Sequence, residues 1–433
     1  MAAPRRLLII ADVRSEAARH LGDEAMLEAN LAALGSAIPG VTIVVAAREP
    51  AWVVARYQLE AVTPAAATVA LAGADALVVS GGGNLSSSWP DLVAERTALL
   101  KAAQAHRKPA ILLGQTLGPV LRVDERRLLE ETLPFVRFLG VRELPSALLA
   151  LALGVPPERL WYQADDALFL GIDSIEGDHA AEASPITPPE VIAVTIDQQL
   201  RMAGSVLFDA LAAQLGALSR TTGAALVLVP HVFGGETSGH ASDLTEARLL
   251  AARLDLGEES IAIGLDARGA ARASARAGLV ISTRYHPIVF GLGSGVASLG
   301  IHGDEYCRIK LEGALAHAGL ERFTLSYEAV ARGGLLPMAL ALWRSRGDVR
   351  FGLEAARAVW RGEARKRWEA VLCALDPARE GVPPESGTLL GRAARDVVSG
   401  ITSNLETRRE AWEGERARLE GVVAELTAQL GEA

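Results

Sequence analysis

The chain has 433 residues, half of them hydrophobic and 22% charged, and its formal net charge is −9. These values are typical of a folded protein with two domains, and they exclude a chain that is disordered throughout. The acidic balance disfavours nucleic acid as a partner, so an anionic ligand would need a local basic cluster. Cys307 and Cys373 are too few for a disulfide framework and lack metal-site spacing, which fits a reducing compartment.

No membrane-targeting or membrane-spanning segment is expected from the apolar runs. The run Leu7–Ala11 is too short for the core of a signal peptide. No uncharged apolar run approaches the roughly 20 residues that a spanning helix needs. We therefore expect a cytoplasmic protein.

Short apolar strands alternate with amphipathic helices in the first 170 residues. Strands are predicted at 6–11, 41–46, 76–80 and 110–114, and helices at 23–34 and 91–106. The strands are apolar throughout instead of alternating, as in a parallel sheet that is covered on both faces. This order predicts right-handed βαβ units.

Residues 171–190 interrupt the pattern with an acidic segment that contains Pro and Ser, which predicts an interdomain linker. The pattern then resumes, with strands predicted at 191–196, 225–230, 279–282 and 296–301 and helices at 206–219, 243–254 and 306–318. We therefore predict an α/β protein with two Rossmann-like domains, over 1–170 and 191–340. Open α/β sheets bind ligands at the carboxyl ends of their strands, so the two domains should face a common cleft.

The C-terminal part of the chain is predicted to be a helical extension. Residues 341–400 are rich in Arg and are interleaved with Trp343, Trp360 and Trp368. These helices fit either packing against the first domain or peripheral contact with anionic lipid at the inner face of a membrane.

Residues 401–433 repeat apolar side chains every seven positions. The repeat is formed by Leu405, Trp412, Leu419 and Leu426, with Val423 and Leu430 at the offset positions. This spacing predicts a coiled coil that would support a homo-oligomer, although Arg416 interrupts it and a helix free in solvent is the alternative.

The densest group of candidate site residues follows the predicted strand 279–282. Arg284 and His286 stand there beside Pro287, which suits the first turn of a helix. A helix N-terminus and a guanidinium together favour a phosphate or a carboxylate. A capped loop with Arg284 paired to a surface acid is the alternative.

Further candidates follow other predicted strands. Arg308 and Lys310 are two residues apart, so only one of them is expected to face the cleft, and a solvated helix end is the alternative. His231 and Arg142 also follow predicted strands.

Glycine-bearing loops supply the last candidates. These loops hold Gly82, Gly83 and Asn84, then Gln115, and then Asp23 at the start of a helix. Such loops let a backbone approach a ligand closely, but tight strand–helix turns explain them equally well. None matches a Walker loop or a dinucleotide-binding fingerprint.

Seven motifs, taken in order, resemble the polysaccharide pyruvyl transferase family. They are 22–25 (GDEA), 81–85 (GGGNL), 114–119 (GQTLGP), 141–143 (VRE), 165–167 (DDA), 284–290 (RYHPIVF) and Lys310 before 318–320 (AGL). The resemblance covers about residues 5–330 and implies two Rossmann-like domains of the glycosyltransferase-B type. Many members carry Arg-Leu-His where this chain has Arg284-Tyr285-His286, and the loop before Lys310 is longer here, so we expect a different acceptor.

The resemblance implies transfer of the enolpyruvyl group of phosphoenolpyruvate onto two hydroxyls of a sugar or lipid-linked saccharide, with release of phosphate. The phosphate and the carboxylate of phosphoenolpyruvate call for cationic side chains, here Arg284 with Arg142 or Lys310. Protonation of C3 calls for a general acid, which we assign to His286. Arg308, His231, Gly82, Gly83, Asn84, Gln115 and Asp23 are further candidate binding residues. No metal or other cofactor is expected.

Two other functions fit the same sequence. A glycosyltransferase of this architecture would use a nucleotide sugar and could hold it with His231 and Arg284. An inactive scaffold would instead use the heptad tail to organise a polysaccharide assembly complex.

Overall fold

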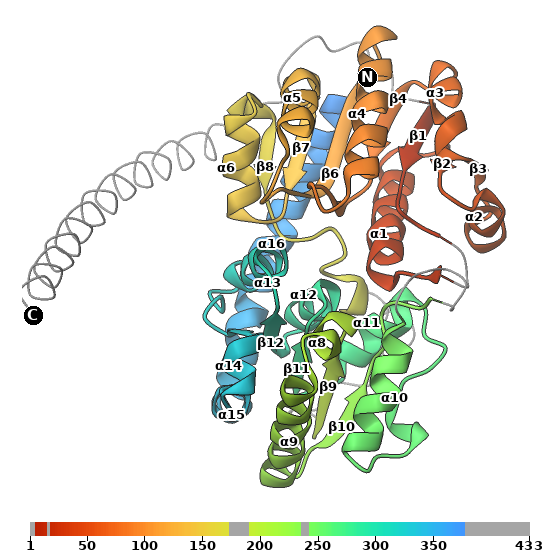
Figure 1. Cartoon of the computed structure of the whole chain (residues 1–433). Coiled ribbons are helices and arrows are strands. Elements are labelled where there is room, and N and C mark those ends of the chain that lie inside the picture. Colours follow the sequence, from red (N-terminus) through yellow and green to blue (C-terminus); the bar gives the residue numbers. More distant parts are fainter. Residues whose placement is uncertain (1–4, 15–17, 173–189, 235–241, 377–433) are drawn as a thin grey trace, which may run out of the picture.

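The computed structural model describes residues 5–14, 18–172, 190–234 and 242–376. They form two α/β domains that follow one another in the chain, and a long C-terminal helix lies along both (Figure 1). The predicted α/β class and the pair of Rossmann-like domains are confirmed. Most of the predicted linker and the whole of the heptad segment 401–433 lie outside the described residues.

The first domain is built on a parallel sheet in the order β3-β2-β1-β4-β6-β7-β8, with β5 paired to β6. Its strands are β1 (Arg6–Ile10), β2 (Thr42–Ala46), β3 (Glu60–Val62), β4 (Ala76–Val79), β5 (Gly82–Leu85), β6 (Ala110–Leu117), β7 (Phe138–Val141) and β8 (Leu160–Tyr162). Its helices are α1 (Leu21–Ala37), α2 (Pro50–Tyr57), α3 (Pro64–Ala72), α4 (Pro90–Ala105), α5 (Val123–Thr132) and α6 (Leu144–Ala152). In β1, Leu8 and Ile10 join one apolar cluster and Leu7 and Ile9 join another. Burial on both faces therefore explains the continuous apolar runs.

The second domain has a parallel sheet in the order β10-β9-β11-β12-β13. Its strands are β9 (Val191–Thr195), β10 (Ala225–Leu228), β11 (Leu279–Ser282), β12 (Ala297–His302) and β13 (Thr324–Ser326). Its helices are α8 (Gln198–Met202), α9 (Ser205–Thr222), α10 (Asp243–Arg253), α11 (Ala267–Ala275), α12 (Tyr285–Gly293), α13 (Glu305–Ala316), α14 (Tyr327–Ala331) and α15 (Leu335–Arg344). Both sheets therefore have the arrangement that places ligand-binding loops at the carboxyl ends of strands.

Two glycine-bearing segments differ from the prediction. Residues 82–85 form strand β5 instead of a loop, and β6 continues beyond Gly114 to Leu117. Gly114 has a φ of +50°, and the pairing of β6 with β7 changes register between Leu112 and Gln115. Glycine tolerates this backbone conformation, so the strand bends there without ending.

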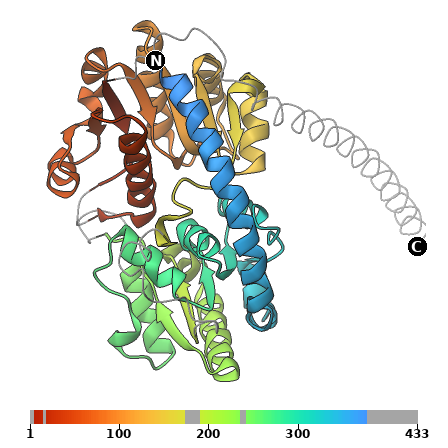
Figure 2. The ribbon, with the colours of Figure 1, turned by 180° about the vertical axis from the view of Figure 1, so that it is seen from behind.

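Helix α16 (Arg346–Leu375) packs against both domains (Figure 2). Leu353 and Trp360 belong to an apolar cluster of the second domain, whereas Val371 and Leu375 belong to a cluster of the first. The helix therefore links the two domains through apolar contacts with each.

The three tryptophans of the Arg-rich segment pack against protein. Trp343 and Trp360 are buried, and Trp368 lies against the cluster of the first domain. The packing of Trp368 against the first domain agrees with the first of the two interpretations of this segment. No helix among the described residues combines the length and the hydropathy that crossing a bilayer would need.

A buried ion pair fixes α16 to the first domain. Arg367 pairs with Asp166, which also accepts hydrogen bonds from Asn30 and Gln163. We expect Arg367→Met to lower the free energy of unfolding by about 1–3 kcal/mol, because a buried carboxylate loses its charged partner. Urea denaturation would measure this loss, with Arg365→Met at an exposed position of α16 as the control. Equal stability of the two variants would contradict the prediction.

Candidate active site between the domains

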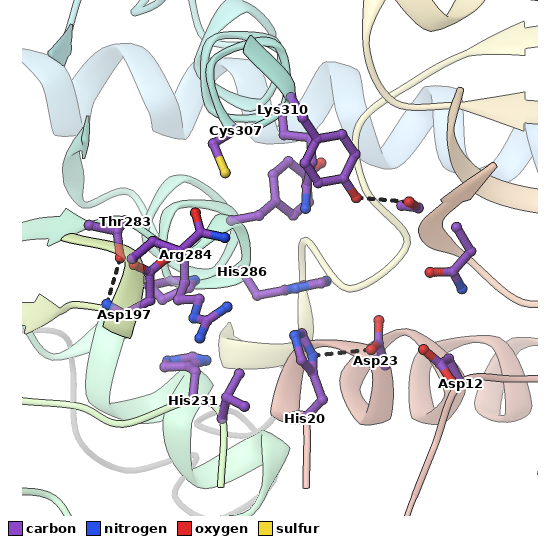
Figure 3. Close-up of a pocket in the computed structure, with 18 of the residues that line it drawn as sticks. Asp12, His20, Asp23, Asp197, His231, Thr283, Arg284, His286, Cys307 and Lys310 are labelled. Carbon is purple, nitrogen blue, oxygen red and sulfur yellow. Dashed lines mark hydrogen bonds and ion pairs between the residues drawn. The ribbon is translucent and has the colours of Figure 1, made fainter. Parts of the chain in front are cut away.

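A pocket of about 400 Å³ lies between the carboxyl ends of the two sheets. The first domain contributes Asp12, Gly22, Asp23, Gly83, Asn84 and Arg142, among others, and the second contributes His231, Arg284, His286, Tyr306 and Lys310. Figure 3 shows the labelled side chains of both domains pointing toward one space. The predicted cleft is therefore present, and it brings together residues far apart in the sequence.

Arg284 follows β11 and precedes α12, as its position after an apolar strand predicts. The Ser282 hydroxyl accepts a hydrogen bond from the Arg284 backbone N–H at 2.8 Å and so fixes the turn. The guanidinium donates to Asp243 Oδ1 at 2.7 Å. Asp243 is buried, so Arg284 is held by an interior carboxylate and not by the surface acid of the alternative interpretation.

His286 lies in the first turn of α12, and its side chain is buried. Its Nε2 atom has no hydrogen-bond partner and lies 4.0 Å from Asp165 Oδ1. Burial, followed by the positive charges of Arg142 and Lys310, lowers the pKa of His286 well below its usual value. The imidazole is therefore neutral near pH 7, whereas the sequence suggested a pKa near neutrality.

Gly22 in α1 leaves the space that the His286 ring occupies. A Cβ atom at Gly22 would lie 1.9 Å from His286 Nδ1. We expect Gly22→Ala to destabilise the protein by about 1–3 kcal/mol, because the ring or a domain has to shift. In contrast, Gly35→Ala in the same helix meets no atom within 4 Å and should not destabilise it. Thermal unfolding of both variants tests the prediction, and an unchanged melting temperature for Gly22→Ala would contradict it.

Arg142 follows β7 and is almost completely buried at the base of the pocket. It donates to Asp165 Oδ2 at 2.8 Å and to Thr116 Oγ1 at 2.6 Å. Its guanidinium carbon lies 4.3 Å from the centre of the Tyr285 ring. The Nε atom has no hydrogen-bond partner but lies 3.5 Å from Glu143 Oε1, so two buried carboxylates surround this guanidinium.

Lys310 reaches the pocket from α13. Its Nζ atom lies 4.6 Å from the centre of the Tyr306 ring, and no carboxylate among the described residues forms an ion pair with it. The Tyr306 hydroxyl donates to the Gly83 carbonyl at 2.8 Å across the domain boundary. The ammonium group is thus available to an anion in the cleft.

Three predicted site residues lie outside the pocket lining. Arg308 pairs with Glu305 and Glu312 along its own helix, so Lys310 is the member of this pair that faces the cleft. Gln115 is buried and donates to the carbonyls of Ser80 and Leu113, which gives it a structural role. Gly82 is a buried residue of β5. Consequently Gly83 and Asn84, but not Gly82, line the pocket.

His231 lines the pocket as predicted, but it has few polar neighbours. Neither ring nitrogen has a hydrogen-bond partner, and the ring stacks on Phe290 with centres 5.9 Å apart. Burial and the charge of Arg284 lower the pKa of His231 to about 3. An uncharged imidazole at this position can donate or accept a hydrogen bond but adds no positive charge.

One wall of the pocket is formed by Asp12, His20 and Asp23. Of these three residues, only Asp23 was predicted from the sequence. His20 Nδ1 lies 3.1 Å from Asp23 Oδ2, as Figure 3 shows. Burial and the nearby Asp12 raise the pKa of Asp23 to about 8. The sequence feature that could have indicated His20 was its position three residues before Asp23, at a predicted helix start.

Two α/β domains that face a common cleft define the glycosyltransferase-B architecture. The structure is similar to a Listeria monocytogenes protein assigned as a UDP-N-acetylglucosamine 2-epimerase, with a TM-score of 0.56, 15% identity and coverage of 87% of this chain and 98% of that one. It is also similar to Anabaena HepE in complex with UDP and glucose, with a TM-score of 0.52, 14% identity and coverage of 91% and 100%. At these identities the similarity establishes the fold alone.

The polysaccharide pyruvyl transferase family model matches residues 20–304, which is more than half of the chain. The chain therefore belongs to the polysaccharide pyruvyl transferase family, as the seven motifs indicated. A comparison with curated proteins found no match.

Proposed function

We propose that this protein transfers the enolpyruvyl group of phosphoenolpyruvate onto two hydroxyls of a sugar, forming a cyclic pyruvate ketal and releasing phosphate. The observation that carries this proposal is the unpartnered, buried Nε2 atom of His286 in a cleft that also holds Arg142, Arg284 and Lys310. Family membership gives the reaction class, and this cluster fits a small ligand with two anionic groups.

Lys310 is the cation best placed to take the ligand's phosphate, because it forms no ion pair within the described part of the chain. Arg284 and Arg142 are oriented by Asp243 and Asp165, and their remaining N–H groups can hold the second anion. These carboxylates keep both guanidinium groups in place before the ligand arrives, which lowers the entropy cost of binding.

In this proposal His286 accepts the proton of a sugar hydroxyl. A neutral imidazole accepts a proton, so the lowered pKa favours a base over the acid that the sequence suggested. A bound anion offsets the charges of Arg142 and Lys310 and therefore raises the pKa of His286. The base thus becomes stronger once the substrate is in place.

The sugar would enter from the side of the first domain. Trp89 is 44% exposed and lines the pocket there, next to Ser88 and Asn84. An exposed aromatic ring can pack on the apolar face of a pyranose, while amide and hydroxyl groups bind its hydroxyls.

Calorimetry with phosphoenolpyruvate, followed by a phosphate-release assay with a panel of p-nitrophenyl hexosides, tests the proposal. We expect binding of phosphoenolpyruvate and release of phosphate only with a suitable hexoside. Binding without release for any acceptor, including a lipid-linked saccharide, would favour the scaffold alternative.

A nucleotide sugar is the competing ligand, because two structures with a similar fold have been crystallised, one with UDP-GlcNAc and the other with UDP and glucose. A ligand that binds the native state raises the melting temperature, so thermal shifts separate the two functions. We expect a shift with phosphoenolpyruvate and none with UDP-GlcNAc. The reverse result would support a glycosyltransferase.

A further inference from the structure

We propose that Asp23, oriented by His20, is a second proton-transfer residue of the site and donates the proton that C3 of phosphoenolpyruvate receives. This inference rests on the proposed function and divides the proton transfers between two residues on opposite walls of the cleft. Asp23 serves as the acid, and His286 serves as the base toward the sugar hydroxyl.

The position of Asp23 supports this role. Gly22 packs directly against the His286 ring, so the first turn of α1 places the next residue beside the same space. Figure 3 shows Asp23 and His286 approaching the pocket from facing elements. The Asp23 side chain is 16% exposed, and its Oδ2 atom lies 3.1 Å from His20 Nδ1.

The surrounding charges keep a proton on Asp23. Burial and Asp12 raise its pKa to about 8, against the opposing effects of Lys310, Arg142 and Arg14. Burial, Arg284 and Lys310 lower the pKa of His20 to about 4. Near pH 7 the pair is therefore a neutral carboxylic acid beside a neutral imidazole. An anionic substrate beside Asp23 would hold the proton more firmly still.

The reaction has two steps, and in each step Asp23 and His286 each transfer one proton. In the first step the sugar oxygen bonds to C2, its proton goes to His286, and the C2–C3 double-bond electrons take the proton of Asp23. In the second step another hydroxyl bonds to C2 and the bond from C2 to the phosphate oxygen breaks. Asp23 takes the proton of that hydroxyl, and His286 returns its own to the departing phosphate. Both groups end as they began.

Asp23→Asn tests the inference, with Asp91→Asn as a matched control because Asp91 is an exposed carboxylate in the first turn of α4. The assay uses phosphoenolpyruvate and the hexoside that releases most phosphate with the wild type. We expect Asp23→Asn to lower kcat by about 10²–10⁴-fold, as loss of a general acid usually does. Its affinity for phosphoenolpyruvate should be unchanged or higher, and Asp91→Asn should behave as wild type.

The pH profile separates a proton donor from a structural residue. Wild-type kcat/KM should fall as pH rises through the pKa of Asp23, near 8 in the free enzyme. Asp12→Asn removes a repelling carboxylate and lowers the pKa of Asp23, so the decline should move to lower pH. An unmoved decline overturns the inference even if Asp23→Asn fails to fold.

Two other results also overturn it, namely a kcat within tenfold of wild type for Asp23→Asn, or loss of phosphoenolpyruvate binding in that variant with kcat retained. Failure of the proposed function is distinct from these results. In that case the wild type itself neither binds phosphoenolpyruvate nor releases phosphate.

Discussion

His286→Ala is expected to lower kcat for phosphate release by about 10²–10⁴-fold, the usual effect of removing a general base. Phosphoenolpyruvate should still bind, because burial and neighbouring cations keep the imidazole uncharged in the empty site. Arg284, Arg142 and Lys310 remain to hold the anion. Steady-state phosphate release and calorimetry measure the two effects separately.

His302→Ala is the matched control, since His302 ends the neighbouring strand β12 and lies outside the pocket lining. This variant should keep wild-type kcat. Activity of His286→Ala within about tenfold of wild type would exclude His286 as the base, since a general base contributes more than that. A variant with weaker phosphoenolpyruvate binding and unchanged kcat would make His286 a binding residue.

The main elements of the fold could be predicted because the parallel strands are buried on both faces. Such strands are apolar at every position, as β1 and β4 are, and stand out against helices with polar faces. Strand β5 could not be found in this way, because Gly82, Gly83 and Asn84 carry no apolar side chain. Its pairing with β6 depends on backbone hydrogen bonds, which every residue except proline can form.

Candidate site residues could be found where they directly follow a strand. Arg284 and Arg142 were predicted in this way, and both line the pocket. Their partners Asp243 and Asp165 were not assigned, because these contacts join residues 41 and 23 positions apart. The sequence shows which side chains carry charge, but the tertiary fold determines which of them remain available to a ligand.

The pair Arg308 and Lys310 illustrates this limit. Spacing on a helix shows that only one of the two faces the cleft, and it does not show which. Glu305 and Glu312 are placed at i−3 and i+4 from Arg308, so they hold its guanidinium along the helix surface. That local pairing pattern was present in the sequence and would have favoured Lys310.

Arg142→Met is expected to lower the free energy of unfolding by about 3–5 kcal/mol, because it leaves buried carboxylates without their cation. Asp165 and Glu143 are both buried, and burial raises the pKa of each even with Arg142 present. Without the arginine these pKa values rise further, so the carboxyls take up protons as the pH falls. The stability deficit, measured by urea denaturation, should therefore be smaller at pH 5 than at pH 8.

A double variant separates the structural role of Arg142 from its role toward the substrate. Asp165→Asn removes one of the unpaired charges, so adding it to Arg142→Met should restore part of the stability. The second substitution restores no cation to the pocket. Calorimetry should therefore still detect at least tenfold weaker phosphoenolpyruvate binding than in the wild type, a loss of about 1.4 kcal/mol of binding free energy. If the double variant instead regains both stability and affinity, Arg142 serves the fold alone, and Lys310 with Arg284 accounts for anion binding.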